Sequence, residues 1–286
     1  MSAVTKIAWC DSTFNPWIGC TEISTAKSGG GGCDHCYARQ LDARKRWGGI
    51  THWGAGVPRY RTKDWKKPLR WNAEAAKTGE RWTVFPSLCD PFDNEVPMIW
   101  RHDLWQLIRD TPYLTWLLLS KRIGNVEKMW PPPLLPNIWL GASIVNQEEL
   151  RRDWPKLRDT PAAKRFISYE PAIASVDWCE ALGIWWNSTL REWVREDVLR
   201  PDQIIVGGES DQGKHKARPF DIEWARSTIR QCRAAGVSVF CKQIGSNAGT
   251  MLRARCGTWE RFPTKERAGA DPAEWPADLR VQEIPT

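Results

Sequence analysis

Three cysteines, Cys20, Cys33 and Cys36, lie in a polar, Gly-rich stretch where a small apolar side chain has little to pack against. Cys33 and Cys36 form a Cys-x-x-Cys pair, so both thiolates can reach one metal centre, and Cys20 can join them across a longer loop. Three thiolates on a [4Fe–4S] cluster leave one iron free to bind S-adenosylmethionine (SAM). Reductive cleavage of SAM there gives a 5′-deoxyadenosyl radical, which abstracts hydrogen.

Two other chemistries fit the same cysteines. The run Cys33-Asp34-His35-Cys36 is also typical of a zinc knuckle, in which His35 would be a ligand. Cys33 and Cys36 could instead form a redox-active disulfide. The spacing alone leaves the cluster, the zinc site and the disulfide open.

The remaining cysteines predict a different role. Nine cysteines at uneven spacing do not suggest a disulfide framework, and four of them lie in or beside apolar runs. No apolar run approaches the roughly 20 residues of a membrane span, and no signal-peptide core follows the N-terminus. We therefore expect a cytoplasmic protein in which Cys89, Cys179, Cys232 and Cys241 are core residues.

Short apolar runs alternate with helical patterns along most of the chain. Continuous apolar runs are typical of parallel strands buried on both faces, and strand–helix alternation indicates βαβ units. The sequence therefore predicts an α/β fold, either a full or partial barrel or, as the alternative, an open doubly wound sheet. Strands are expected at 82–85, 113–119, 137–141, 165–169, 204–206 and 237–241, with one more near the N-terminus, and helices near 98–109, 147–157 and 221–235.

Nearly every predicted strand runs directly into a polar or charged residue. In α/β barrels the active site lies at the carboxyl ends of the strands, which favours a site here over simple polar loops. The residues concerned are Asp90, Lys121, Ser143, Glu170, Glu209 and Lys242.

Four segments do not follow this alternation of strands and helices. Residues 29–32 are four glycines without the Gly-Lys-Ser/Thr of a phosphate-binding loop, so we expect a spacer. Residues 47–69, rich in Gly, Trp, Arg and Lys, suggest an ordered loop region. Residues 172–201 suggest an insertion with an amphipathic helix carrying Leu190, Trp193, Val194 and Val198. Residues 246–286 are polar and suggest a C-terminal extension that packs on a main domain of residues 1–245.

Several motifs together resemble a phage-associated family of three-cysteine, radical-SAM-like proteins of long unknown function. The opening WCDSTFNPWIGC at 9–20 and GCDHCYA at 32–38 carry the resemblance most strongly. It continues through LSKR at 119–122, WLGAS at 139–143, FISYEP at 166–171, IVGGES at 205–210, ARP at 217–219 and FCKQ at 240–243. The resemblance covers about residues 7–245, although the loop between the first two cysteines is longer than in most radical-SAM enzymes.

This resemblance implies a partial (β/α)6 barrel of the radical-SAM type, with a cluster loop at residues 20–36 after the first strand. It places Ser87 and Asp90 near the methionine amino group of SAM, and Lys121 or Arg122 at the methionine carboxylate. Ribose and adenine would contact Ser143, Glu170 and the turn at Gly207 and Gly208. The alternatives are a solvated Lys121 and an internal ion pair of Glu170 and Glu209 with Lys242.

The substrate is suggested by charge and by the resemblance together. A net charge of +7 and a pI of about 9.0 favour a polyanionic partner, and some of the 20 tryptophans could stack on bases. The resemblance to a phage-associated family implies that this partner is DNA. The specific hypothesis is radical isomerisation of an N-linked glycinyl-thymine to its C-linked form in DNA hypermodification. Glu209 or Lys242 would hold the amino acid, Tyr169 or Cys241 would return a hydrogen, and a flavodoxin-like protein would supply the electron.

Other functions fit the same sequence features. Repair of thymine dimers is a radical-SAM reaction on the same polymer, and modification of RNA or a peptide would use the same cofactor. A zinc-stabilised module that binds nucleic acid without catalysis is the remaining alternative.

Overall fold

The computed structural model describes residues 5–23, 31–130, 135–252 and 258–285, so residues 29 and 30 of the predicted spacer lie outside the described residues. The chain divides into two compact units, which are described separately. The first comprises Met1–Ala26, Cys36–Ala142 and Asp159–Lys164, and the second comprises Lys27–His35, Ser143–Arg158 and Arg165–Thr286.

The predicted parallel strands are present, with bounds within a few residues of those expected. Their order is β1-β4-β5-β6-β7-β10-β12, so the α/β class is confirmed. The strands are β1 (Ser12–Thr13), β4 (Trp82–Phe85), β5 (Leu114–Ser120), β6 (Ile138–Ser143), β7 (Lys164–Tyr169), β10 (Gln203–Gly207) and β12 (Ser238–Gln243).

These strands are buried on both faces, as their continuous apolar runs predict. Every residue of β6 is buried, including the neighbours Trp139 and Leu140, whose side chains point to opposite faces. Ile204, Ile205 and Val206 of β10 are likewise fully buried. Side chains on both faces of these strands therefore belong to the core. A sheet covered on one face only would bury every second side chain.

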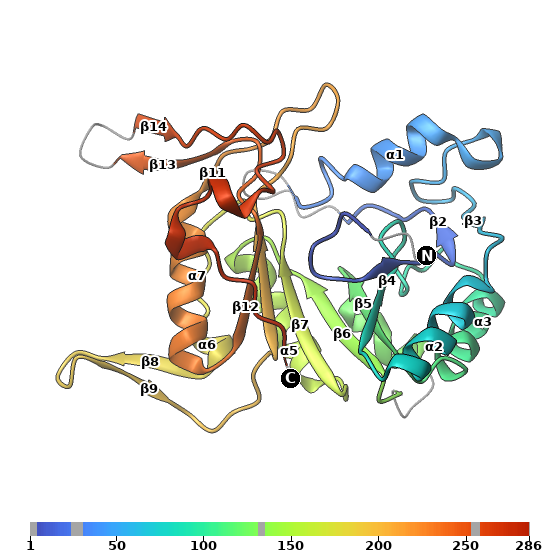
Figure 1. Ribbon diagram of the computed structural model, residues 1–286, viewed down its shortest axis with the longest axis horizontal. Helices are drawn as coiled ribbons and strands as arrows, with labels where there is room; N and C mark the ends of the chain where they lie inside the picture. Colours follow the sequence, from blue (N-terminus) through green and yellow to red (C-terminus); the bar gives the residue numbers. More distant parts are fainter. Residues whose placement is uncertain (1–4, 24–30, 131–134, 253–257, 286) are drawn as a thin grey trace. The chain divides into compact units, whose positions relative to one another are not determined.

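In the first unit, α2 packs against β4 and β5, and α3 is drawn next to α2 (Figure 1). The helix predicted near 98–109 is present as α3, which begins directly after Pro97. Residues 47–69 are ordered, as predicted. The smaller elements of this unit are β2 (Trp17–Ile18), α1 (Tyr37–Lys45), η1 (Trp47–Gly49), β3 (Tyr60–Arg61), α2 (Lys67–Thr78), α3 (Met98–Arg109), η2 (Ile123–Asn125) and α4 (Val126–Met129).

In the second unit, α7 packs along β10 and β12 (Figure 1). Asp221 caps its first turn by accepting the amide of Glu223, and Gly236 ends it in a left-handed conformation. Both predicted helices of this unit are present. Its elements are α5 (Gln147–Asp159), α6 (Cys179–Leu182), β8 (Ile184–Asn187), β9 (Glu192–Arg195), β11 (Phe220–Asp221), α7 (Ile222–Ala235), β13 (Ala248–Leu252), β14 (Thr258–Arg261), η4 (Pro272–Glu274) and η5 (Ala277–Leu279).

The C-terminal extension is built into this unit. The amide of Cys241 donates to the carbonyl of Val281 (2.7 Å), and Phe240 forms an antiparallel bridge with Gln282. Trp275 and Leu279 are almost fully buried. The tail therefore pairs with the free edge of β12, which shields an edge that would otherwise be open to other chains.

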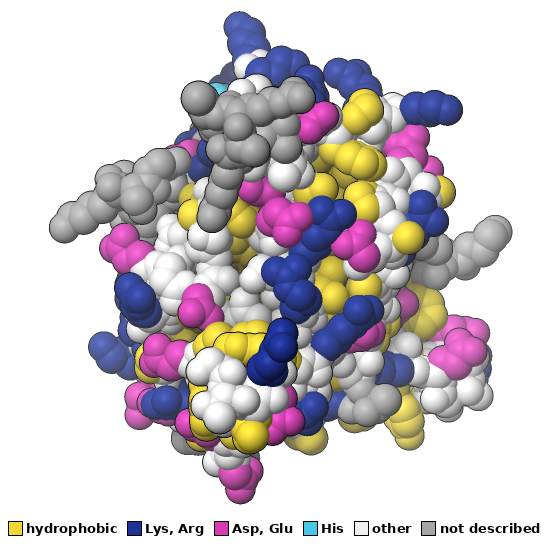
Figure 2. All heavy atoms as spheres, turned by 90° about the vertical axis from the view of Figure 1, so that its left-hand side faces the viewer, with side chains coloured by type: hydrophobic (Ala, Val, Ile, Leu, Met, Phe, Trp, Pro, Cys, Tyr) yellow, Lys and Arg dark blue, Asp and Glu magenta, His cyan; other side chains and the backbone are white. Residues whose placement is uncertain are grey.

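The amphipathic helix predicted within residues 172–201 is wrong. In the hairpin found there, β8 pairs antiparallel with β9. Leu190 lies in the turn before β9, Trp193 and Val194 lie in β9, and Val198 follows it. The side chain of Asn187 accepts the amides of Thr189 and Leu190, so an Asx turn reverses the chain where a helix would continue. Figure 2, which views the side with this hairpin, shows hydrophobic side chains at the surface between Lys and Arg side chains.

No helix among the described residues is long and apolar enough to cross a membrane.

Gly208 follows β10 where the chain passes close to the segment after β12. A Cβ atom at this position would lie 2.3 Å from the carbonyl oxygen of Ile244, which is backbone and has little room to move. We expect Gly208→Ala to lower the free energy of unfolding by about 1–3 kcal/mol, as overpacking does. Urea unfolding of this variant beside Ser188→Ala, an exposed hairpin substitution, measures the difference, and equal stability of the two would contradict the close approach.

Candidate functional site

Cys20 lies at the carboxyl ends of the strands in the first unit. The preceding residue, Gly19, forms a parallel bridge with Cys89, just beyond β4, and its amide donates to the carbonyl of Leu88 (3.1 Å). Gly19 has a φ of 116°, and a Cβ atom there would lie 2.2 Å from the carbonyl oxygen of His52. Glycine is therefore required immediately before Cys20 for the chain to pass between these neighbours.

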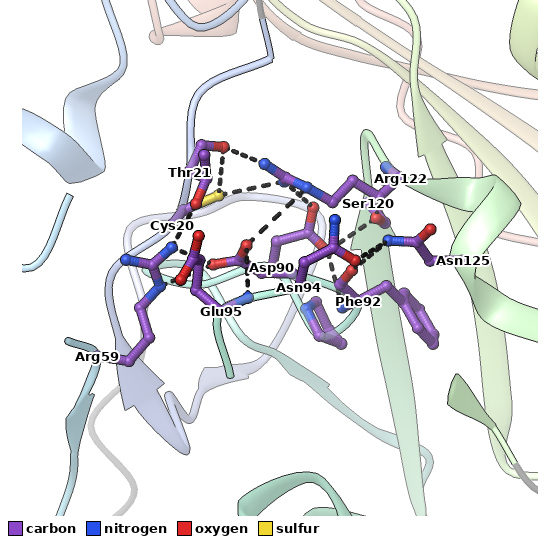
Figure 3. Close-up of polar contacts among 12 residues, drawn as sticks. Cys20, Thr21, Arg59, Asp90, Phe92, Asn94, Glu95, Ser120, Arg122 and Asn125 are labelled. Atoms are coloured by element: carbon purple, nitrogen blue, oxygen red, sulfur yellow. Dashed lines mark hydrogen bonds and ion pairs between the residues drawn. The ribbon is translucent and has the colours of Figure 1, made fainter. Parts of the chain in front are cut away.

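Arg122 joins Cys20 to the end of β4. Its Nη1 donates to Asp90 Oδ2 (2.9 Å) and to Cys20 Sγ (3.5 Å), and its Nη2 donates to the carbonyl of Thr21. Asp90 also accepts from Ser120 Oγ (2.7 Å) and from the amide of Phe92 (2.9 Å). Figure 3 shows Arg59 and Arg122 approaching the segment of Cys20 and Thr21 from two sides.

These contacts change what Asp90 and Arg122 can do. Both side chains are largely buried, and these hydrogen bonds use both carboxylate oxygens of Asp90 and both terminal nitrogens of Arg122. Their contact with SAM, which the family resemblance implies, stays a prediction. The observed geometry gives them a nearer partner, the backbone and thiol of the Cys20 segment.

Arg59 holds the same segment from the other side. Its guanidinium forms an ion pair with Asp93 at 2.7 Å, and neither side chain has any exposed surface. The remaining N–H groups donate to the carbonyls of His52, Gly54 and Val57 and to the hydroxyl of Thr21. This buried charge is therefore compensated both by an opposite charge and by hydrogen bonds, which is the condition for burying it.

Cys20 lies beside a group of charged side chains. We call Arg59, Arg101, Arg122, Asp90 and Asp93 the charged cluster; Arg101 belongs to it because its guanidinium donates to the carbonyls of Pro91 and Asp93. Burial raises the pKa of the Cys20 thiol and Asp90 raises it further, whereas Arg122 lowers it.

Cys36 is tied to the same loop after β4. It precedes the first residue of α1, and its carbonyl accepts the amide of Gln40 (3.2 Å). The next residue, Tyr37, donates its hydroxyl to the carbonyl of Ser87 (2.6 Å). Ser87 Oγ, half-buried, has one long hydrogen bond from Asn15 Nδ2 (3.4 Å).

Cys33 belongs to the second unit, so the boundary between the units falls within the Cys-x-x-Cys pair. It lies in a turn that Asp34 closes, since the Asp34 carboxylate accepts the amide of Gly31 (2.9 Å). Among the described residues, no group of three or more His, Cys, Asp or Glu is gathered to hold a metal ion. Cys20, Cys33 and Cys36 are all half-buried, and none of them is part of a disulfide.

Glu209, at the end of β10, holds this turn in place. It accepts three hydrogen bonds from the amide and guanidinium of Arg218 and one contact from His35 Nδ1 (2.9 Å). Arg218 in turn donates to the carbonyl of Gly31 (3.2 Å). Burial alone would raise the pKa of Glu209, but the hydrogen bonds from Arg218 and His35 hold that pKa below its ordinary value.

Lys242 pairs with Glu170 in the same unit. Its Nζ lies 2.9 Å from Glu170 Oε1, and Gly207 packs against that carboxylate. The predicted alternative of an internal ion pair is thus present for Glu170, whereas Glu209 pairs with Arg218 instead. Lys242 and Glu170 remain partly exposed, so a ligand could reach them.

The remaining predicted residues differ in accessibility. Tyr169 and Cys241 have no exposed surface, and the Tyr169 hydroxyl donates to the carbonyl of Ala174. Burial raises the pKa of both groups, that of Cys241 to about 12. Ser143 is buried at the end of β6, and Lys121 is half-buried just after β5. Of the four cysteines predicted as core residues, Cys232 and Cys241 are buried and Cys89 and Cys179 only half-buried.

The donor set fits an iron–sulfur cluster by its chemistry. Thiolates are the ligands of such clusters, and none of Cys20, Cys33 and Cys36 is part of a disulfide. Burial and Asp90 raise the pKa of the Cys20 thiol overall, whereas the guanidinium N–H of Arg122 on Cys20 Sγ lowers it, as a hydrogen bond to a ligating thiolate would.

A family model for "Protein of unknown function (DUF5131)" matches residues 4–270. The chain belongs to the DUF5131 family. A search of curated proteins and a search of solved structures gave no match. The family match covers both units, so the contacts of Cys20 and those of Glu209 both lie within the part of the chain that defines this DUF5131 protein.

Sequence reasoning missed the residues that hold the cysteine segments. These residues lie in loops: Arg59, Asp93, His35 and Arg218. Arg59 and its partner Asp93 are 34 residues apart along the chain, and His35 and its partner Glu209 are 174 residues apart. Two signals were available: Arg218 lies in the motif ARP, and Asp93 follows Asp90 by three residues.

We expect Arg59→Ala to lower the free energy of unfolding by about 3–5 kcal/mol, because it leaves the Asp93 carboxylate buried without its partner. Arg70→Ala is the matched control, since Arg70 pairs with Asp64 at the surface (3.6 Å) and should change stability by less than about 1 kcal/mol. Chemical denaturation of both variants makes the comparison. Equal losses of stability in the two variants would show that the buried ion pair contributes no more to stability than the surface pair.

Proposed function

We propose that this DUF5131 protein is a radical-SAM enzyme, with a [4Fe–4S] cluster held by Cys20, Cys33 and Cys36 in a partial (β/α)6 barrel. The observation that carries the proposal is the place of the Cys20 thiol. It lies at the carboxyl ends of β4 and β5, where α/β barrels hold their active sites, and accepts a hydrogen bond from Arg122. A bound cluster would supply the electron that cleaves SAM to a 5′-deoxyadenosyl radical.

The chain's own residues would then have distinct roles. Arg122 and Arg59 fix the Cys20 segment through Thr21, so the ligating sulfur does not depend on a flexible loop. Glu209 and Arg218 do the same for the turn that contains Cys33. We assign these residues to positioning the cysteines, because their polar groups are already used within the protein.

The groups that remain for SAM and substrate are those at strand ends with accessible or lightly bonded polar atoms. Ser87 fits the methionine amino group, and the Glu170–Lys242 pair offers both charges to a zwitterionic amino acid. Return of a hydrogen by Tyr169 or Cys241 would need a path to a fully buried side chain. The basic charge and the family resemblance favour a thymine-derived base in DNA as substrate, with isomerisation of a glycinyl-thymine as the specific reaction.

A target base inside a duplex is out of reach of a site at the strand ends. The enzyme would have to act on single-stranded DNA or flip the base out of the stack, at a cost of a few kcal/mol. A damaged or modified thymine lowers that cost, which is one source of selectivity.

One observation favours a second candidate, a zinc-stabilised module. Glu209 contacts Nδ1 of His35 and leaves Nε2 for another partner, as carboxylates do for histidines that bind zinc. In that case Cys20, Cys33 and Cys36 would be ligands with His35 as the fourth, and the protein would have no radical chemistry.

We expect Cys20→Ala, Cys33→Ala and Cys36→Ala each to lose iron and to form no 5′-deoxyadenosine from SAM under reducing conditions. Cys89→Ala and Cys179→Ala are matched controls, because both remove a half-buried thiol outside the proposed ligand set. Iron content and 5′-deoxyadenosine, measured without oxygen, are the readouts.

Full SAM cleavage by Cys20→Ala would remove Cys20 from the ligand set. Equal iron loss in Cys89→Ala would show that proximity to the charged cluster, and not ligation, decides iron content. The substrate is tested separately, by mass spectrometry of nucleosides from DNA carrying N-linked glycinyl-thymine after incubation with enzyme and SAM. An unchanged nucleoside would end the isomerase assignment.

A further inference from the structure

The positive charge of this protein is concentrated in one segment of the first unit. Residues 37–81 contain twelve Lys and Arg against four Asp and Glu, a net charge of +8. The whole chain carries +7, so all other residues together sum to −1. The basic balance is therefore not spread over the protein as a general aid to solubility.

This segment forms a connected layer of short elements. Asp42 of α1 accepts the amide of His52 (2.5 Å), and the carbonyl of Trp47 contacts the ring of His52 (2.6 Å). The His52 ring lies 5.5 Å from that of Tyr60 in β3. Arg61 continues the layer by placing its guanidinium over Trp65, just before α2. Figure 1 shows α1, β3 and α2 following one another along one margin of the first unit.

Most basic side chains of this layer face solvent. Arg59 is buried in the charged cluster and Arg61 pairs with Asp103, but the exposed ones include Arg44, Lys45, Arg46, Lys63, Lys66 and Lys77. We call these six the basic surface. Of the four acidic residues, Asp42 is fully buried and does not reduce the charge that an approaching molecule meets.

Tryptophans alternate with these cations along the chain. Trp47, Trp53 and Trp65 lie among them in the sequence and are half-buried, and the guanidinium of Arg61 lies over the ring of Trp65. Exposed indoles beside Lys and Arg are the combination that binds polynucleotides, because phosphates attract the cations and bases stack on the rings. Lysine is depleted at protein–protein interfaces, so a surface in which four of six cations are lysines fits a protein partner less well.

We propose that the basic surface docks DNA through its phosphate backbone, and so presents the strand to the enzyme independently of base recognition. This inference rests on the proposed function for the choice of DNA as the polymer. The contacts would be to phosphates, so they would set affinity and register but carry little sequence preference.

The test compares two variants of the full-length protein with equal changes in charge. The first is Arg44→Gln/Lys45→Gln/Lys63→Gln/Lys66→Gln in the basic surface. The second is Lys214→Gln/Arg230→Gln/Arg233→Gln/Lys265→Gln, four exposed cations of the second unit. Fluorescence anisotropy with duplex and single-stranded DNA oligonucleotides measures affinity from low to moderate salt, and circular dichroism confirms that both variants fold.

We expect the first variant to lose at least tenfold in affinity and the second to stay within about twofold of the unchanged protein. The slope of log affinity against log salt should fall by up to about 3–4 in the first variant alone, since each lost phosphate contact removes about 0.9. Equal losses in both variants would show that only net charge matters and would overturn the proposal. Displacement of DNA by polyglutamate at equal charge would do so too, because it would assign the surface to an acidic protein.

The assay contains neither SAM nor a reductant, so its outcome is separable from the proposed function. A protein that holds no iron but binds DNA through these residues would contradict the radical-SAM proposal and support the docking surface. A protein that holds iron but whose DNA affinity does not depend on these residues would contradict the docking surface and leave the radical-SAM proposal standing.

Discussion

A guanidinium without exposed surface, that of Arg59, fixes the part of the chain on which the candidate site depends. Its ion pair with Asp93 and its hydrogen bonds to three carbonyls and to Thr21 satisfy a charge that would otherwise be very costly to bury. Because Thr21 follows Cys20 directly, the position of the thiol is set by packed, charged groups and not by the loop alone. The rest of the first unit supplies the strand ends that hold these partners.

The two units use the same physical device for different parts of the cysteine segment. In the first unit, Arg122 bridges Asp90 and the Cys20 segment. In the second unit, Arg218 bridges Glu209 and the turn of Gly31 to His35. In both cases a carboxylate at the end of a buried strand orients an arginine, whose planar donors then hold backbone carbonyls of the cysteine segment. In each unit this pairing fixes the backbone beside one cysteine, Cys20 in the first and Cys33 in the second.

The sequence predicted the strands well, because continuous apolar runs such as Trp116 to Leu119 can be buried only between covered faces. It also predicted polar residues at the strand ends, where Asp90, Glu170 and Glu209 do lie. It failed at residues 184–195, where apolar spacing suggested a helix but the Asx turn at Asn187 makes a hairpin. The buried arginines that bind several loops, such as Arg59, could not be predicted, since their partners depend on which distant loops the fold brings together.

Local patterns also could not decide between ligand and positioning roles. The family resemblance places Asp90 and Arg122 at a bound cofactor, and it does not reveal that they bind each other. Lys242 differs, because its ion pair with Glu170 was one of the alternatives that the sequence left open. Only the three-dimensional pairing separates polar groups that are already used from those still open to a ligand.

The central claim is that the cysteines hold an iron–sulfur cluster, and elemental analysis of protein purified without oxygen tests it most directly. The account predicts about four irons and four sulfides per chain, with zinc well below one. Stoichiometric zinc in a colourless protein that contains no sulfide would contradict it.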